Sequence, residues 1–542
     1  MLPLRSMSIP YNALRFIAGA YPFLSYLRGK PRWMSDFSLL QHIERCTHMN
    51  QLRLIHAKMI RNHEIEDVLK VSRVIAFCAL SNYGSLDYAR RIFALIKSPN
   101  IYIWNTIIRG YVQSSNPSEA FALYKKLLSK GLIPNNYTFP FLLKACTQLV
   151  YLNIGSSIHA STIKYGFEDS DAFIQTALVH LYASCGFIDL ARKMFDRCDE
   201  RDVTSWNALM KGYVHSGRHR EAISLFQTML RRASWVKPDE VTMLAVLTAC
   251  GHSGALDRGS WVHRYMEANK LKRAVRLETA LVDMYAKCGS IETARRLFDA
   301  TVERDGHLWS VMIGGLAMHG MAKEALSLFS EMQRVGGVVP DSVTFTSVLS
   351  ACSHAGLVQV GLHHLEIMKD YGIESTIEHY GCVVDLFGRA GLLQEAMEFV
   401  KKMPVKPDVA LWGSVLLACN AHGNVKIGEV AAKEMLGLDP LNGGAHVFLS
   451  NIYASTRSWD EVIRVRNQMK DHGITKPPGC SLIEVDGFVH EFLVGDRSHP
   501  EAESIYKMLD EIDKLLKREV YGPTSKGTFF DVDEEESEHN SD

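Results

Sequence analysis

A repeat of about 103 residues runs through the chain and restricts what it can fold into. Trp104, Trp206, Trp309 and Trp412 are separated by 102, 103 and 103 residues. The segments 178–196 and 281–299, which lie 103 residues apart, are identical at 11 of 19 positions. Repeats of this kind form arrays in which each unit packs against its neighbours. The chain is therefore expected to form one elongated array in place of several globules.

Within the repeat, the unit is a pair of short amphipathic helices, as residues 203–239 illustrate. Apolar residues recur at helical spacing from Trp206 to Tyr213 and again from Ala222 to Met229, with Gly217 between the two runs. Each helix is too short to be stable alone, and the pair leaves an apolar face for a neighbouring pair to cover. About three such hairpins fill 103 residues. The predicted fold is an all-α, right-handed α-solenoid.

The charge of the chain is balanced. Lys plus Arg and Asp plus Glu number 60 each, so net charge gives no indication of nucleic-acid binding. Residues 1–34 hold five basic residues and no acidic one, whereas residues 529–542 hold seven acidic residues and no basic one. Without these ends the counts are 55 and 53, so a positive surface would need local placement of charge. The acidic stretch is expected to be a disordered tail within 511–542.

Residues 1–34 are typical of an organellar transit peptide. The acid-free leader contains Arg5, Arg15, Arg28, Lys30 and Arg32, and its apolar run at 16–27 is too short and interrupted to span a membrane. Its few serines favour the mitochondrion over the plastid. The alternative is a disordered basic arm. No other stretch approaches a transmembrane helix, so no membrane span is expected.

The cysteines do not indicate a metal or redox site. There are eleven, and none forms a C-x-x-C pair. A histidine follows a cysteine once per repeat at Cys250, Cys352 and Cys419. These pairs are interpreted as packing thiols beside a turn histidine, so neither a metal nor another cofactor is predicted.

Several segments resemble the pentatricopeptide repeat family. The resemblance is carried by residues 101–135 (WNTIIRGYV and EAFALYKKLL), 203–239 (SWNALMKGYV, EAISLFQTML and VKPD) and 306–341 (LWSVMIGGLAMHG, EALSLFSEMQ and VVPD). The alternation of longer and shorter hairpins resembles the PLS subclass of plant organelles. The resemblance implies an array over 35–407, with a degraded start at 37–100. P-type repeats are expected at 101–135, 203–239 and 306–341, L-type at 136–171, 240–274 and 342–376, and S-type at 172–202, 275–305 and 377–407.

In that family the fifth and last residues of a repeat read one RNA base on its Watson–Crick edge. The resemblance implies guanine for the Thr/Asp repeats, uracil for Asn/Asp, a pyrimidine for Asn/Asn and a purine for Ser/Asp. L-type repeats and the last S-type repeat depart from the pattern, with Pro140, Leu244 and Gly381 at the fifth position. When the fifth and last positions of the family's repeats are mapped onto this sequence, the candidate base-reading pairs are Asn105 with Asn135, Thr176 with Asp202, Asn207 with Asp239, Thr279 with Asp305, and Ser310 with Asp341.

A plainer interpretation exists for these ten residues. Asn, Ser and Thr near a helix start are ordinary caps, and Asp after Pro is an ordinary turn residue. Capping accounts for any one position. It does not account for the common phase of Thr176 and Thr279, each followed 26 residues later by Asp202 or Asp305.

The C-terminal region changes character after the array. Residues 408–478 resemble the family's E domain, and 479–510 its E+ extension, where Asp486-Gly487 indicates a small β-hairpin. A short amphipathic helix follows, with Ile505, Leu509, Ile512 and Leu516 on one side. Some relatives continue into a zinc-dependent cytidine deaminase. That enzyme needs H-x-E and C-x-x-C, and this chain has no C-x-x-C, so it is not expected to be an enzyme.

The resemblance implies an RNA-binding factor that selects a site for C-to-U editing in an organellar transcript. The expected partners are single-stranded organellar RNA and, through the E and E+ regions, a DYW-type cytidine deaminase and other editing factors supplied in trans. The sequence leaves two alternative functions open. One is an RNA clamp for splicing or transcript stabilisation, and the other is a tetratricopeptide-like scaffold that binds protein.

Overall fold

The computed structural model describes residues 39–519, except 169, 199–200, 233–235, 272–273, 336, 476–479, 486–487 and 494–496. The predicted transit peptide, the acidic tail and the Asp486-Gly487 turn lie outside the described residues. The chain divides into two compact units between residues 200 and 201. Each unit is treated by itself.

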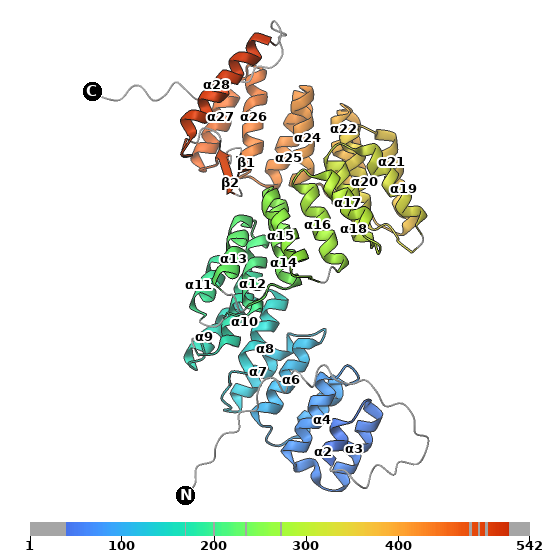
Figure 1. Cartoon of the computed structure of the whole chain (residues 1–542), viewed down its shortest axis with the longest axis vertical. Helices are drawn as coiled ribbons and strands as arrows, with labels where there is room; N and C mark the ends of the chain where they lie inside the picture. Colours follow the sequence, from blue (N-terminus) through green and yellow to red (C-terminus); the bar gives the residue numbers. More distant parts are fainter. Residues whose placement is uncertain are drawn as a thin grey trace, which may run out of the picture. The chain divides into compact units, whose positions relative to one another are not determined.

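The first unit is a series of helical hairpins (Figure 1). Its first helices from α4 onward contact one another in sequence order, and each second helix packs on the first helix of its own hairpin. The elements are α2 (Leu39–Glu44), α3 (Met49–Arg61), η2 (Glu64–Glu66), α4 (Val68–Leu80), α5 (Leu86–Leu95), α6 (Ile101–Gln113), α7 (Glu119–Ser129), α8 (Thr138–Leu149), α9 (Leu152–Lys164), α10 (Ala172–Ser184) and α11 (Ile188–Arg197).

The second unit continues the same construction. Its even-numbered helices from α12 to α24 form one row of neighbouring first helices. The hairpins are made by α12 (Val203–His215), α13 (His219–Arg232), α14 (Glu240–Ser253), α15 (Leu256–Ala268), α16 (Val275–Lys287), α17 (Ile291–Ala300), α18 (Gly306–Met318), α19 (Ala322–Arg334), α20 (Ser342–Ala355), α21 (Val358–Ile367) with η3 (Met368–Tyr371), α22 (Ile377–Arg389) and α23 (Leu393–Lys402). Each expected P, L or S range contains one hairpin, and the predicted all-α solenoid packing is confirmed within each unit.

The recurring tryptophans explain why the period is so regular. Trp104 on α6 and Trp309 on α18 are fully buried, and each meets a phenylalanine of the preceding hairpin edge to face. The ring centroids are 4.6 Å apart for Phe93 and Trp104 and 5.0 Å apart for Phe298 and Trp309. A large aromatic pair of this geometry fills the space between consecutive hairpins. The tryptophan therefore marks a packing position of the array.

A second recurring position requires glycine. Gly155 on α9, Gly259 on α15 and Gly361 on α21 each face the first helix of the next hairpin. A Cβ added at Gly155 would lie 2.6 and 2.8 Å from the two methyl groups of Leu181, and Leu181 is itself fully buried. The missing side chain thus allows second helices of the L-type repeats to approach the following S-type hairpin closely.

The C-terminal region adds two hairpins and a β-ribbon to the second unit. The helices are α24 (Val409–His422), α25 (Val425–Leu438), α26 (Gly443–Ser455) and α27 (Trp459–Asp471), and their buried residues share one core with those of α22 and α23. Strands β1 (Cys480–Val485) and β2 (Phe488–Leu493) pair antiparallel, with Val485 opposite Phe488. The predicted β-hairpin is therefore confirmed. Helix α28 (Ala502–Glu519) follows. Among the described residues, no helix is both long and apolar enough to cross a membrane.

We expect Gly155→Ala to destabilise the protein, because the added methyl group overlaps the packed side chain of Leu181. Overpacking of this kind costs about 1–3 kcal/mol. The control is Gly437→Ala on α25, where a Cβ meets nothing within 4 Å and helix propensity favours alanine. Thermal unfolding monitored by circular dichroism should give a lower midpoint for the first variant and an unchanged or higher midpoint for the second. Equal midpoints would contradict the close-packing role.

Candidate nucleic-acid interface

The ten predicted reader residues lie on first helices or at the boundaries between hairpins. Asn105, Asn207, Thr279 and Ser310, on α6, α12, α16 and α18, are at most 7% exposed, whereas Thr176 on α10 is half-buried. The last residue of each repeat comes directly before or near the next first helix. The last residue of a repeat can therefore reach the fifth residue of the same repeat from the start of the next hairpin.

The boundary after residue 239 forms a closed hydrogen-bonded group. The amide Nδ2 of Asn207 donates to Oδ1 of Asp239 over 2.9 Å, and the hydroxyl of Thr242 donates to Oδ1 of Asn207 over 2.7 Å. The backbone N–H of Thr242 also donates to Oδ1 of Asp239, over 2.9 Å. The carboxylate accepts only, so Asn207 must turn its NH₂ group toward it. The orientation of the Asn207 amide is fixed by this contact.

The boundary after residue 135 repeats this group with an amide in place of the carboxylate. Nδ2 of Asn105 donates to Oδ1 of Asn135 over 2.9 Å, and the hydroxyl of Thr138 donates to Oδ1 of Asn105 over 2.8 Å. The backbone N–H of Tyr137 donates to the same oxygen of Asn135, over 3.2 Å. A backbone N–H can only donate, which sets the orientation of both amides.

At the boundary after residue 341 the link between the reader positions is indirect. The hydroxyls of Ser310 and Thr344 are 2.7 Å apart, and that of Thr344 donates to Oδ1 of Asp341 over 2.8 Å. Because Thr344 gives its hydrogen to Asp341, Ser310 is the donor to Thr344 in this link, and the backbone oxygen of Gly306, 2.8 Å from Ser310 Oγ, is the alternative acceptor. Threonine thus connects the fifth and last residues at every P-to-L boundary.

The two Thr/Asp pairs are arranged differently. The hydroxyl of Thr279 donates to the backbone oxygen of Val275 over 2.8 Å, and Asp305 accepts the backbone N–H of Leu308 over 2.9 Å. Thr176 belongs to the first unit and Asp202 to the second, where Asp202 accepts the backbone N–H of Ser205 over 2.9 Å. The side chains of Thr279 and Asp305 are thus each bonded within their own hairpins.

The capping interpretation is correct for the aspartates. Asp202, Asp239, Asp305 and Asp341 are the N-caps of α12, α14, α18 and α20, and each accepts a backbone N–H of the first turn through one oxygen. The second oxygen is outside that bond. A residue here can therefore cap a helix and still offer an acceptor to a ligand.

Thr138, Thr242 and Thr344 are boundary residues that the sequence reasoning missed. All three are fully buried, and each occupies the third position after the last residue of a P-type repeat. In two of the three, the structure has a reciprocal capping box with the aspartate. The spacing Asn/Asp-x-x-Thr, which resembles the capping-box pattern, is the signal that could have identified them.

Hydrogen bonding keeps the Asp239 carboxylate ionised despite its partial burial. Burial, the largest single influence, raises the pKa of Asp239, but the hydrogen bonds from Thr242 and Asn207 together lower it below its ordinary value. The acceptor at this boundary therefore carries a negative charge at neutral pH.

The cysteines of the array are packing residues in this structure. Burial raises the pKa of Cys146 to about 12 and that of Cys419 to about 11, so both remain thiols. The ring Nε2 of His422 lies 3.0 Å from the backbone oxygen of Gly388. The described ranges contain no cluster of three or more His, Cys, Asp or Glu that could hold a metal ion.

We expect Thr242→Val to destabilise the array by about 1–3 kcal/mol, because the buried amide oxygen of Asn207 loses its donor. Thr248→Val on the same helix is the matched control, since that hydroxyl donates only to the backbone oxygen of Leu244. The midpoint of thermal unfolding should fall in Thr242→Val and change little in Thr248→Val. A similar change in both would mean that the boundary group does not stabilise the fold.

Comparison with known families agrees with the geometry. The PPR repeat family matches residues 99–148, 201–252 and 304–354, and the PPR repeat matches 176–203, 279–305, 343–373 and 378–406. The E motif matches residues 422–484 and the E+ motif residues 489–515.

Curated relatives cover nearly the whole chain. A chloroplastic pentatricopeptide repeat-containing protein of Arabidopsis thaliana is 34% identical over 98% of this chain and 89% of its own length. A mitochondrial one from the same plant is 35% identical over 91% of this chain and 93% of its own. The crystal structure of PPR10 from maize is 17% identical, covers 78% of this chain and 66% of its own, and has a TM-score of 0.49. The chain belongs to the pentatricopeptide repeat family and carries its E and E+ motifs.

Proposed function

We propose that the protein binds one single-stranded site in an organellar transcript and positions a separate cytidine deaminase there for C-to-U editing. One observation carries the RNA-binding part: at all three P-to-L boundaries hydrogen bonds connect the fifth residue, the last residue and a threonine, directly at two boundaries and through the threonine at the third. Pentatricopeptide repeats read RNA one base per repeat with two or three side chains. Helix capping accounts for the aspartates, but it does not account for the buried amides of Asn105 and Asn207 that bond to the last residues of their repeats.

The unused hydrogen-bonding capacity at the boundary after residue 239 suits uracil. One amide N–H of Asn207 bonds to Asp239, and the other is available as a donor. Oδ2 of Asp239 is outside the bonds to Oδ1 and is an acceptor. Uracil presents a carbonyl acceptor beside its N3–H donor, which complements a donor next to an acceptor. The pair Asn207 and Asp239 is therefore assigned to uracil.

The other pairs differ in their remaining donors and acceptors. At the boundary after residue 135, both Asn105 and Asn135 have amide N–H groups to donate, and two donors complement the adjacent acceptors of cytosine. Thr279 has already donated its hydroxyl hydrogen, so Thr279 and Asp305 both offer acceptors. Two acceptors complement the N1–H and N2–H groups of guanine. Ser310 and Asp341 also offer acceptors, which favours a purine.

In this proposal, specificity comes from several reader pairs, each of which contacts its own base along the RNA strand. A net hydrogen bond contributes about 1 kcal/mol. Each pair then discriminates about fivefold between a correct and an incorrect base, and the pairs act together along the strand. Thr176 with Asp202 is included by its sequence phase as a second guanine pair.

The E and E+ regions supply the surface for the deaminase. Helix α28 is amphipathic, and Met508, Leu509, Ile512 and Leu515 on its apolar side are 44–57% exposed. Large exposed apolar stripes on a helix mark protein interaction sites. The deaminase itself, and other editing factors, are partners in trans, and the protein acts as a recruiting factor without a catalytic site of its own.

The site of action is an organelle. The relatives described above are named chloroplastic and mitochondrial. The acid-free, arginine-bearing residues 1–34 support a mitochondrial transit peptide, with the plastid as the alternative.

Exchanging one reader residue should exchange base preference. We expect Thr279→Asn to shift the preference at its position from guanine to uracil, because the amide adds a donor beside Asp305. Asn207→Thr should produce the reverse shift at its own position. Binding to oligoribonucleotides that differ at one base checks both, with an expected change of about fivefold in relative affinity.

Each variant is the control for the other, since only the altered position should change. If neither preference moves, or if the purified protein binds peptides and no RNA, the array is a protein-binding scaffold and the assignment is wrong.

The editing role predicts loss of C-to-U conversion at one or a few sites in organellar cDNA from a loss-of-function line. We expect a transgene carrying Ile512→Asp to fail to restore conversion, because a charge interrupts the apolar side of α28. Lys514→Asp, which places the same residue at an exposed charged position of that helix, should restore it. Both purified variants should bind RNA with wild-type affinity. Altered transcript ends or introns with every edit intact would instead indicate an RNA clamp.

A further inference from the structure

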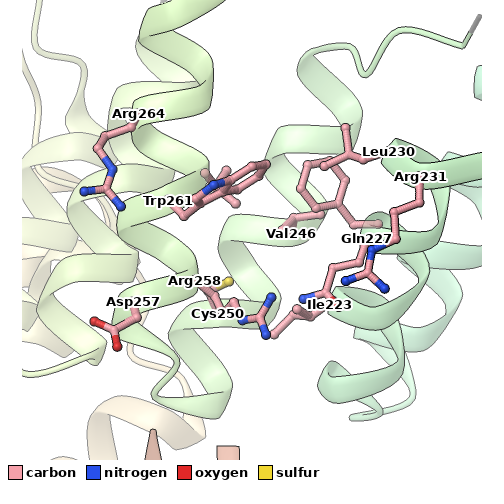
Figure 2. A pocket seen from close by; sticks show the side chains of 12 residues that line it. Ile223, Gln227, Leu230, Arg231, Val246, Cys250, Asp257, Arg258, Trp261 and Arg264 are labelled. Carbon is pink, nitrogen blue, oxygen red and sulfur yellow. The ribbon is translucent and has the colours of Figure 1, made fainter. Parts of the chain in front are cut away.

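A cavity of about 440 Å³ lies on the side of the second unit formed by second helices. Figure 2 shows that Trp261 projects from α15 toward α13, while Gln227 and Arg231 extend from α13 on the opposite wall. Val246 of α14 belongs to the buried floor, and Arg258 lies at one end. Aromatic, apolar, amide and cationic groups therefore meet in one hollow of ligand-binding size.

The repeat itself provides an internal comparison for this cavity. Counting from the equivalent glycines 155, 259 and 361, the position of Trp261 is occupied by Ser157 in the preceding L-type repeat and by His363 in the following one. The position of Arg258 is occupied by isoleucine and valine in those repeats. Packing of the L-type hairpin thus requires neither residue, and their combination is specific to the middle repeat.

Trp261 is built as a stacking surface. Its indole is 43% exposed although tryptophan is usually well covered. One side is supported by Tyr265, with ring centroids 5.4 Å apart and planes at 24°, and Phe226 meets it edge on at 6.3 Å. These two rings hold the orientation of the indole, and Phe226 also lines the cavity. Tyr265 covers one face of the indole, so a planar ligand would stack on the other face.

Polar groups on the opposite wall can recognise the rest of such a ligand. Arg231 forms no ion pair within the described part of the chain and is exposed at the rim. Gln227 offers both a donor and an acceptor amide group. Asp257 also borders the cavity, but its carboxylate points away from the space between Trp261 and Arg231 in Figure 2. The charge facing the cavity interior is therefore positive.

We propose that this cavity binds a nucleoside phosphate. The base stacks on Trp261 and hydrogen-bonds to Gln227, and the phosphate pairs with Arg231, while Arg258 borders the end of the cavity. Base stacking on aromatic side chains and arginine contacts to phosphate are the general means of binding unpaired nucleotides. An acidic peptide would satisfy the arginines but has no group that matches an exposed, ring-supported indole. The nucleoside phosphate comes either from a free nucleotide or from an RNA nucleotide.

The site is distinct from the proposed base-reading positions. The cavity uses Val246 of α14, whereas Asp239 and Thr242 at the start of that helix bond to α12. Variants in the cavity should therefore leave base preference at Asn207 unchanged, so the two proposals can fail separately.

The test is calorimetric titration of the full-length protein with AMP, adenosine and ribose 5-phosphate. We expect AMP to bind, and Trp261→Ser, which introduces the residue of the preceding repeat, to weaken it about tenfold or more. Arg231→Ser should weaken AMP but not adenosine. Trp459→Ser on α27 removes another exposed tryptophan and should leave the affinity unchanged. Trp261→Phe, which retains a ring, should restore most of the affinity and shows that loss of fold is not the cause.

Oligoribonucleotides identify the source of the ligand. If RNA supplies it, Trp261→Ser lowers the affinity for an oligoribonucleotide that AMP also competes for. If a free nucleotide supplies it, Trp261→Ser lowers the affinity for AMP alone. The proposal is overturned if AMP does not bind at millimolar concentration, if Trp261→Ser leaves AMP binding unchanged, or if only an acidic peptide binds in a Trp261-dependent manner.

Discussion

Every short helix in this protein depends on the neighbouring hairpin to cover its apolar face. The helices are mostly 10 to 14 residues long, a length that is marginal for an isolated helix in water. Edge-to-face contacts such as Phe93 with Trp104, and close approaches such as Gly155 to Leu181, provide this cover at fixed positions of the repeat. Because each contact is between neighbours, the fold is stabilised locally and can be extended by adding units.

The same dependence explains where polar residues can serve a ligand. At a boundary between hairpins, the first turn of a helix has N–H groups without partners inside the helix. A side chain from the preceding hairpin lies close to them there. Asp239 satisfies these N–H groups through Oδ1 and receives Asn207 at the same atom. Thr242 locks both in place from the next helix. These polar groups are therefore already oriented, so little ordering of the protein would be needed for a ligand to bind there.

Positions at which one repeat differs from the others give information about function that a single position cannot give. The three L-type hairpins share the close approach of their glycines, Gly155, Gly259 and Gly361, to the following hairpin. Trp261 differs from its counterparts, Ser157 and His363, so the packing shared by the three hairpins does not require a tryptophan there. In a chain with internal repeats, the equivalent positions of the other repeats show which residues folding requires. A residue that differs from its equivalents is therefore a candidate for ligand binding.

The sequence by itself determined the helical-hairpin array, its triplet period and the common phase of the candidate reader residues, because these follow from local spacing that recurs along the chain. It also determined the C-terminal β-hairpin, which follows from a local turn signal. Only the tertiary structure decided that Asn105 and Asn207 bond directly to the last residue of their repeats, whereas Thr279 bonds to a backbone oxygen of its own helix. It also decided that a threonine of the next helix, Thr138, Thr242 or Thr344, bonds to the fifth residue. The cavity beside Trp261 likewise could not be predicted, since its walls come from α13, α14 and α15. Periodicity specifies which face of a helix is covered, whereas hydrogen bonds and cavities depend on the distance and orientation of side chains from separate helices, which only packing establishes.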